Sequence, residues 1–128
     1  MKIGVLTQES LWKTINMKVI MNKGDENGSE GLTLIRIDPH DTWSLDHTLA
    51  QIIVPCLKQF KDKLNGYPVI DNSVSGLEAF ENWKSILDKM IYSFEFICSE
   101  DFYNSDISPD KVQEGLDLFG KHYMHLWD

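Results

Sequence analysis

The side chains with the greatest capacity for chemistry are concentrated in one short segment: Asp38, His40, Asp41, Asp46 and His47. Carboxylates and imidazoles bind Zn²⁺ or a harder divalent ion, so one hypothesis is a metal-dependent hydrolase built on this segment. The spacing, however, matches no motif with fixed helical geometry, such as His-Glu-x-x-His. In the structural interpretation, which we prefer, Asp41 and Asp46 bind backbone amides where a strand meets a helix, while His40 stays exposed.

Other candidates for catalysis are weaker. His122 and His125 lie three residues apart and would share one face of a helix, but two imidazoles do not complete a metal site. The sequence has no Gly-x-Ser-x-Gly turn, and neither Cys56 nor Cys98 has a local histidine pattern. Both cysteines fall within apolar helical patterns, which predicts that they are buried as small hydrophobic side chains. We therefore expect a protein without catalytic residues, metal or cofactor.

A strand is expected just before the polar segment. The residues LTLIRID alternate and include β-branched types, which predicts a strand over 32–38 that ends at Pro39. Residues 1–22 carry mixed helix and strand signals, and MKIGVL is a second candidate strand. Residues 22–31 are rich in glycine and acids, which is typical of an exposed loop, and these acids would repel a phosphate group.

The clearest predicted element is a helix over 45–64. Ser44 is a suitable N-cap, and Asp46 in the first turn favours the helix dipole. Trp43 precedes this start as a hydrophobic staple would, so we predict a core anchor. Pro55 removes one backbone hydrogen bond and predicts a kink. The apolar stripe of this helix consists of Leu45, Leu49, Ile52, Ile53, Leu57, Phe60 and Leu64.

Two further amphipathic helices follow. Ser75 and Glu78 have the spacing of a capping box, which predicts a helix over 76–98. A serine N-cap (Ser108) followed by Pro109 predicts the start of a helix over 109–126. The predicted apolar face of the first of these helices contains Leu77, Phe80, Trp83, Leu87, Met90, Ile91, Phe94, Ile97 and Cys98. That of the second contains Val112, Leu116, Phe119, Tyr123 and Leu126.

The composition is that of one globular domain. The chain has 128 residues, 42% hydrophobic and 25% charged, which is enough apolar material for a core and too little charge for disorder. It has no apolar run near the roughly 20 residues that a membrane helix needs, and no secretory signal pattern. We predict a mainly α (α+β) fold, with a three-helix core and one or two N-terminal β-strands, as a single domain over 1–128 in the cytoplasm.

The charge is unevenly distributed along the chain. Residues 1–64 carry eight basic and eight acidic side chains, whereas residues 65–128 carry four lysines and twelve acids and so account for the whole net charge of −8. Arg36 is the single arginine. Nucleic-acid sites depend on clustered Lys and Arg, and arginine is preferred for paired contacts with phosphate. We therefore expect no direct nucleic-acid binding and no membrane binding.

Five segments follow one another in an order that is typical of one protein family. They are Arg36-Ile37-Asp38, Asp41 to Ala50 (DTWSLDHTLA), Val54 to Gln59, Trp83 to Ile91 and Leu118 to Trp127. They match an Arg-Ile-Asp-like strand, a D-T-W-x-x-D-x-T-L-A motif, an L/V-P-x-L-K-Q helix, a W-x-x-x-L-D-x-M-I helix and an LFGKYY-like ending. In these segments the chain resembles a family of small uncharacterised tailed-bacteriophage proteins. The resemblance implies a viral origin and the cytoplasm of the infected bacterial host, and it assigns no activity.

The expected function is that of a phage-encoded, non-catalytic binding protein that acts on a host protein, in host takeover or counter-defence. The acidic second half would be its binding face. Two alternatives stay open, namely sequestration of a small nucleotide signal, for which Arg36 and lysines would have to converge, and the metal-dependent hydrolase. A homo-oligomer is compatible with either binding role. The candidate binding residues are Arg36, His40, Asp41, Trp43, Asp46 and His47.

Overall fold

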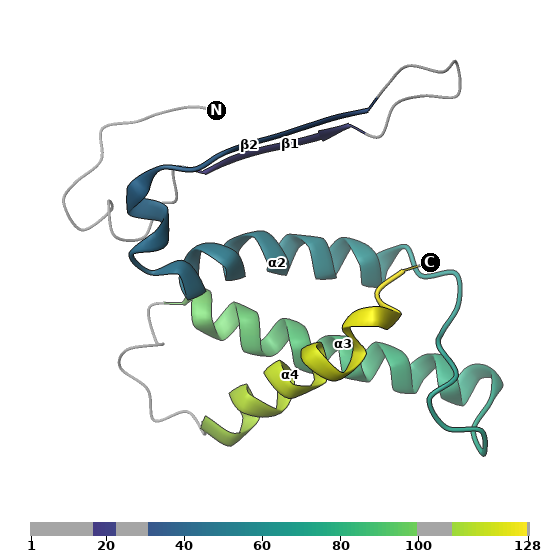
Figure 1. Cartoon of the computed structure of the whole chain (residues 1–128). Coiled ribbons are helices and arrows are strands. Elements are labelled where there is room, and N and C mark those ends of the chain that lie inside the picture. The colour runs from purple at the N-terminus through teal and green to yellow at the C-terminus, as the bar shows by residue number, and fades with distance from the viewer. Residues whose placement is uncertain (1–16, 23–30, 100–108, 128) are drawn as a thin grey trace. The chain divides into compact units, whose positions relative to one another are not determined.

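The described residues form three α-helices and a small antiparallel two-stranded hairpin near the N-terminus, so the predicted mainly helical fold class is confirmed (Figure 1). The computed structural model describes residues 17–22, 31–99 and 109–127. The chain divides into two units, Met1–Thr48 and Leu49–Asp128. Within the described ranges, no helix has both the length and the apolar character that passage through a membrane requires.

The hairpin pairs β1 (Lys18–Asn22) with β2 (Leu32–Arg36). Val19 lies opposite Ile35, and β-branched pairs of this kind favour strand pairing. The sequence signals for residues 18–22 were mixed, and the structure resolves them as a strand. The predicted strand over 32–38 was too long, because Asp38 caps the short helix that follows.

Three sequence predictions fall outside the described residues. They are the candidate strand MKIGVL, most of the loop over 22–31, and the N-cap at Ser108.

Helix α2 (Leu45–Asp62) forms where it was predicted and ends slightly earlier than expected. It continues through Pro55. Its later turns supply Leu57 and partly buried side chains to the core of the second unit. Leu45 and Leu49, however, are 43% and 44% exposed, so the prediction that the buried stripe starts at the first turn was wrong. A periodic apolar pattern identifies a face of a helix, but it does not say where along the helix the packing begins.

Helix α3 (Gly76–Cys98) has the bounds that the sequence predicted. It is the central element of the second unit, because most fully buried side chains of that unit belong to it: Trp83, Leu87, Met90, Ile91, Phe94 and Ile97. Burial of a large aliphatic or aromatic side chain contributes about 1.5–3 kcal/mol each. Leu77 was predicted to join this face but is 76% exposed, because the packed length of α3 begins after its first turn.

Helices α2 and α3 run antiparallel along each other, as their ion pairs show (Figure 1). The ammonium group of Lys58 lies 3.2 Å from a carboxylate oxygen of Glu95, and Lys61 pairs with Asp88. Later residues of α2 thus meet earlier residues of α3. These pairs are largely exposed, so they add little stability, and the apolar contacts beneath them hold the helices together.

Helix α4 (Pro109–His122) packs closely against α3. At the contact, Gly115 is buried, and a Cβ at this position would lie 1.9 Å from Ser93 Oγ and 2.3 Å from the carbonyl oxygen of Lys89. The Ser93 hydroxyl donates across the interface to the carbonyl oxygen of Val112 at 2.7 Å. A glycine is therefore required at this contact, because any side chain would force the two helices apart.

The end of α4 differs from its prediction. The helix stops at His122, and a short 3-10 turn, η3 (Tyr123–His125), follows it. His122 is 2% exposed and Tyr123 is 60% exposed, so the predicted burial of Tyr123 was wrong. The tighter 3-10 turn rotates the side chains away from the α-helical spacing on which that prediction depended.

Candidate functional site

The predicted polar segment forms a local capping structure around η1 (Pro39–Thr42). One carboxylate oxygen of Asp38 accepts the backbone N–H of His40 at 2.8 Å, and the carboxylate of Asp41 accepts the backbone N–H of Asp38 at 2.8 Å. This is a reciprocal capping box. Asp41 is 2% exposed, and its carbonyl oxygen accepts the Thr48 hydroxyl at 2.7 Å. The structural interpretation of Asp41 is confirmed.

The other candidate residues of the junction make mostly local contacts. His40 is exposed, as predicted, and its Nδ1 lies 2.8 Å from a carboxylate oxygen of Asp38. The pKa of Asp38 is lowered mainly by the hydrogen bond from the His40 amide and, to a smaller extent, by the contact with the His40 ring. Asp46 accepts the backbone N–H of His47 at 2.8 Å. Arg36 is the last residue of β2 and is exposed. The carboxylates of Asp38, Asp41 and Asp46 thus accept backbone amides at the strand exit and at the start of the helix.

Trp43 is 64% exposed, so its predicted role as a core anchor was wrong. Its ring contacts the imidazole of His40 edge to face, with the ring centroids 4.4 Å apart. The staple pattern requires the aromatic ring to fold onto the first turn of the following helix, but Trp43 lies in a turn after η1 and faces the preceding residues instead.

A metal centre is not assembled from the part of the chain that the structure describes. No group of three or more His, Cys, Asp or Glu side chains there is arranged to hold a metal ion. At the junction, the carboxylate oxygens that would bind a metal accept backbone amides instead. His122 and His125 do approach each other, with their Nδ1 atoms 3.1 Å apart, but the structure places no third ligand beside them within the described ranges.

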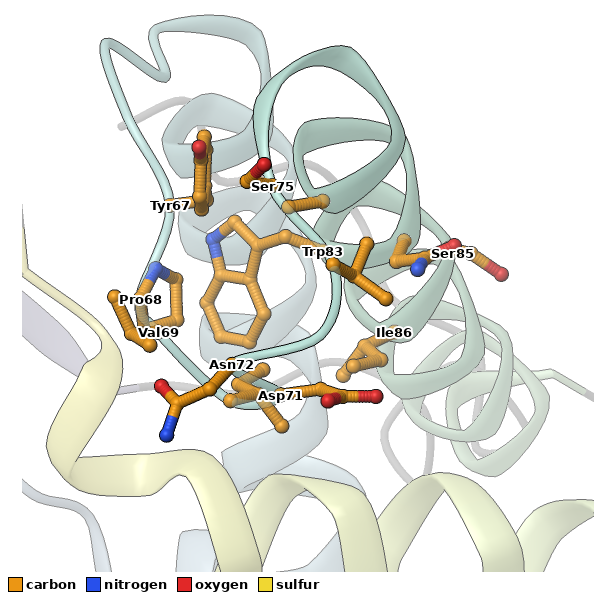
Figure 2. A pocket seen from close by; sticks show the side chains of 13 residues that line it. Tyr67, Pro68, Val69, Asp71, Asn72, Ser75, Trp83, Ser85 and Ile86 are labelled. Carbon is orange, nitrogen blue, oxygen red and sulfur yellow. The ribbon is translucent and has the colours of Figure 1, made fainter.

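A hollow of about 470 Å³ lies between the segment 67–75 and the first half of α3. Figure 2 shows the indole of Trp83 standing at its centre, between Pro68 of the segment and the helix. The apolar side chains that line it include Pro68, Val69, Ile70, Val74, Trp83 and Ile86. We call this hollow the Trp83 pocket. Its size falls within the range of about 300–1,000 Å³ that is typical of ligand pockets.

The segment 67–75 is held in place by its own hydrogen bonds. The Tyr67 hydroxyl accepts the backbone N–H of Gly76 at 2.9 Å, which joins the start of the segment to the start of α3. Asp71 accepts both the amide and the hydroxyl of Ser73, at 2.9 and 2.6 Å. Ser75 is the N-cap of α3 by its backbone, but its side chain makes no capping bond, so the predicted capping box was wrong. The Tyr67 hydroxyl satisfies the first amide of the helix instead.

The electrostatic character of the Trp83 pocket is set by Asp71. Among the described residues that line the pocket, it is the only side chain that is charged at neutral pH, and none of them is a lysine, arginine or histidine. The hydroxyl and the amide of Ser73 lower the pKa of Asp71, so the carboxylate is ionised under physiological conditions. Asn72 and Asn82 add amide donors and acceptors to the lining. The pocket therefore suits an apolar group that is neutral or accompanied by a positive charge.

A second hollow, of about 210 Å³, shares Tyr67, Pro68 and Trp83 with the first and is completed by Gly66, His125 and Trp127. Trp127 is 77% exposed. The ring of His122 packs edge to face against Trp83, with the centroids 5.6 Å apart. Burial lowers the pKa of His122, and the nearby His125 and Lys121 lower it further. The His122 ring thus contacts Trp83, and its lowered pKa favours the neutral imidazole.

The two cysteines differ in exposure. Cys56 is exposed, so its predicted burial was wrong, and Cys98 is half-buried. Burial, followed by the charge of Glu95, raises the pKa of the Cys98 thiol. A raised pKa reduces the thiolate fraction that nucleophilic attack requires.

Sequence reasoning identified the buried face of α3 but missed the Trp83 pocket. The segment YPVIDNSVSG had been assigned only as a loop. The sequence contains only a weak signal, namely the adjacent apolar residues Val69 and Ile70 inside a predicted loop. In the structure they are 74% and 44% exposed.

No protein-family model, curated protein or solved structure matches this chain.

Proposed function

We propose that this chain is a phage-encoded, non-catalytic binding protein that acts on a protein of the bacterial host, in host takeover or counter-defence. The observation that carries the proposal is the charge of residues 65–128, which contain twelve acids and four lysines. An excess of one sign on a surface speeds association with a partner of the opposite sign and disfavours nucleic acid. The partner would therefore present a basic surface, such as that of a DNA-binding enzyme.

The exposed face of α4 supports this proposal. Asp110, Glu114 and Asp117 recur at helical spacing, are exposed, and line one open hollow. Two of the four lysines are engaged nearby with acids of the same unit, since Lys89 lies 2.8 Å from Glu114 and Lys84 lies 3.8 Å from Glu81. Glu114 is therefore partly neutralised, and Lys121 lines the same hollow, so Asp110 and Asp117 are the acids of this face that form no ion pair among the described residues.

Local chemistry supports binding rather than catalysis. The junction carboxylates accept backbone amides, and the Cys98 thiol has a raised pKa. None of the described residues that line the Trp83 pocket is a cation that could neutralise the phosphates of a nucleotide. These observations favour a protein partner over the nucleotide signal and over the metal-dependent hydrolase.

Native mass spectrometry of the affinity-tagged protein, purified from bacterial host cells at low salt, tests the proposal. We expect a complex with a host protein that is lost as the salt concentration rises, because salt screens surface charge. The double variant Asp110→Asn/Asp117→Asn should retain less partner, whereas Asp46→Asn in the first unit should retain as much as the wild type. A bound nucleotide or a stoichiometric metal without a protein partner would contradict the proposal.

A further inference from the structure

We infer that the Trp83 pocket is the anchor site for an apolar side chain of the partner protein, on a segment where lysine or arginine flanks that side chain. This inference rests on the proposed function and deepens it, because it names the chemistry that the partner must offer. It follows from three properties of the pocket: a preformed shape, an apolar lining, and one negative charge at its edge.

The shape exists before any ligand binds. The Tyr67 hydroxyl accepts the Gly76 amide, and the Tyr67 ring contacts Phe80 edge to face at 6.3 Å between centroids. Asp71 and Ser73 fix the turn in the middle of the segment through two hydrogen bonds. A site that is ordered beforehand does not pay conformational entropy when the ligand arrives, and this strengthens binding.

The lining selects an apolar group. Trp83 is 1% exposed and lines the pocket, so it cannot itself enter a partner. Val69 is 74% exposed at the edge and would lose most of its exposed surface on contact. Pockets that bury one aromatic or aliphatic side chain at the centre of an interface supply most of the binding free energy in protein complexes.

The charge selects what lies next to that group. Asp71 is the one charged side chain among the described lining residues, and Glu78 lies on the first turn of α3, next in sequence to the lining residue Ala79. Lys84 is held over the Phe80 ring, 4.7 Å from its centroid. A flanking cation in the partner would therefore meet carboxylates, whereas a flanking acid would be repelled.

Nuclear magnetic resonance of the full-length protein with synthetic peptides tests the inference. The probe is an acetylated decapeptide with a central Leu-Phe pair flanked by lysines. The matched peptides have glutamates in place of the lysines, or alanines in place of Leu-Phe. The reporter is the indole N–H signal of Trp83, which is assigned by its absence in Trp83→Phe.

Only the lysine-flanked Leu-Phe peptide should shift the Trp83 signal in a saturable way. Asp71→Asn keeps an acceptor for Ser73 and should weaken this binding by about two- to fivefold, as the loss of an exposed ion pair does. Val69→Ser should weaken it more. Leu77→Ser is the matched control, because Leu77 is equally exposed but lies outside the lining, and this variant should bind as the wild type does.

Three results would overturn the inference. They are an unshifted Trp83 signal at millimolar peptide, an equal response to the glutamate-flanked peptide, and an equal response to n-butylamine or spermidine, which would identify a small-cation site. Failure here is distinguishable from failure of the proposed function. If the host-protein complex forms and Val69→Ser leaves it intact, the pocket inference falls and the binding function stands. If no complex forms, the function falls.

Discussion

The junction around η1 and the Trp83 pocket differ in the types of side chain they contain and in whether those side chains enclose a space for a ligand. The junction contains the acids and histidines that a catalytic site would need, but its carboxylates accept backbone amides within a few residues along the chain. The pocket contains mostly common apolar residues, yet they enclose about 470 Å³ beside one carboxylate. Reactive side-chain types close together in sequence therefore do not make a site, whereas ordinary side chains around a preformed hollow can.

The largest expected effect on stability is at the contact between α3 and α4. This effect separates the two regions, because α3 carries Trp83 and the junction around η1 lies outside this contact. Gly115→Ala places a Cβ within 2.3 Å of the Lys89 carbonyl oxygen, and backbone cannot move aside as a flexible side chain can. We expect a loss of about 1–3 kcal/mol in the free energy of unfolding. Urea unfolding followed by circular dichroism measures this loss, and the Trp83 indole signal should shift while that of Trp43 does not.

Gly120→Ala is the matched control. Gly120 lies on the same helix, and a Cβ there would meet nothing within 4 Å. Because alanine is the better helix former, this variant should gain about 0.5–1 kcal/mol. If Gly115→Ala proves as stable as Gly120→Ala, the close packing of α3 against α4 is disproved.

The next largest effect concerns the junction. Asp41→Ala removes the buried acceptor of the Asp38 amide, and we expect it to cost about 0.5–2 kcal/mol, as the loss of a cap does. Asp46→Ala should cost less, about 0.3–1 kcal/mol, because Asp46 is exposed and acts on the first turn of α2. Thermal melts with EDTA and with Zn²⁺ or Mn²⁺ measure both.

These melts also test the metal hypothesis for the junction. We expect that neither metal ion raises the melting temperature of the wild type. A rise of several degrees that both variants abolish would restore the hydrolase hypothesis and would make the junction, rather than the pocket, the functional region.

A smaller effect would sharpen the account of the pocket. Tyr67→Phe removes the acceptor of the Gly76 amide, which costs at most about 0.5–1.5 kcal/mol. Hydrogen exchange at Gly76 should become faster by up to roughly tenfold, while the junction amides keep their wild-type rates. Tyr92→Phe is the control, since the Tyr92 hydroxyl makes no hydrogen bond within the described part of the chain. Unchanged exchange in Tyr67→Phe would mean that this bond does not order the segment.

The smallest effect is a dependence on pH. His122 behind Trp83 has a pKa below its ordinary value of 6.5, mainly because it is buried, so the folded state favours the neutral ring. The resulting stability is complete above the unfolded pKa and is lost as the pH falls through the lower, folded pKa. Wild-type protein should therefore melt at a lower temperature at about pH 5.5 than at about pH 7.5. His122→Asn should lose part of this difference; an unchanged difference would exclude His122 as its source.

The sequence predicted the helices and strands better than it predicted which side chains they bury. The periodicity of α3 identified its buried face from Trp83 to Ile97, because such a face repeats with the helix. The predicted start was correct although the capping box on which it rested does not form. Trp43 and Cys56 were predicted to be buried and are exposed, because a local pattern does not specify which elements will cover a side chain. The capping role of Asp41 could be predicted because it is local in sequence.

The Trp83 pocket could not be predicted for the opposite reason. It depends on the path of the segment 67–75 over α3. The hydrogen bond from the Gly76 amide to the Tyr67 hydroxyl holds this path, and it joins residues nine positions apart that share no sequence motif. Nor could the sequence show that Gly115 lies at a close helix contact. Gly120 is also a glycine on the same helix, but a Cβ there would meet nothing within 4 Å.

The affinity of the purified host partner for three forms of the protein tests the central claim most directly. Isothermal titration calorimetry would compare the wild type with Val69→Ser at the pocket and Asp46→Ala at the junction. The account predicts that Val69→Ser raises Kd by about fivefold or more, as truncation of a central contact does, and that Asp46→Ala leaves Kd within about twofold of the wild type. The reverse result, with binding lost in Asp46→Ala and kept in Val69→Ser, would contradict it.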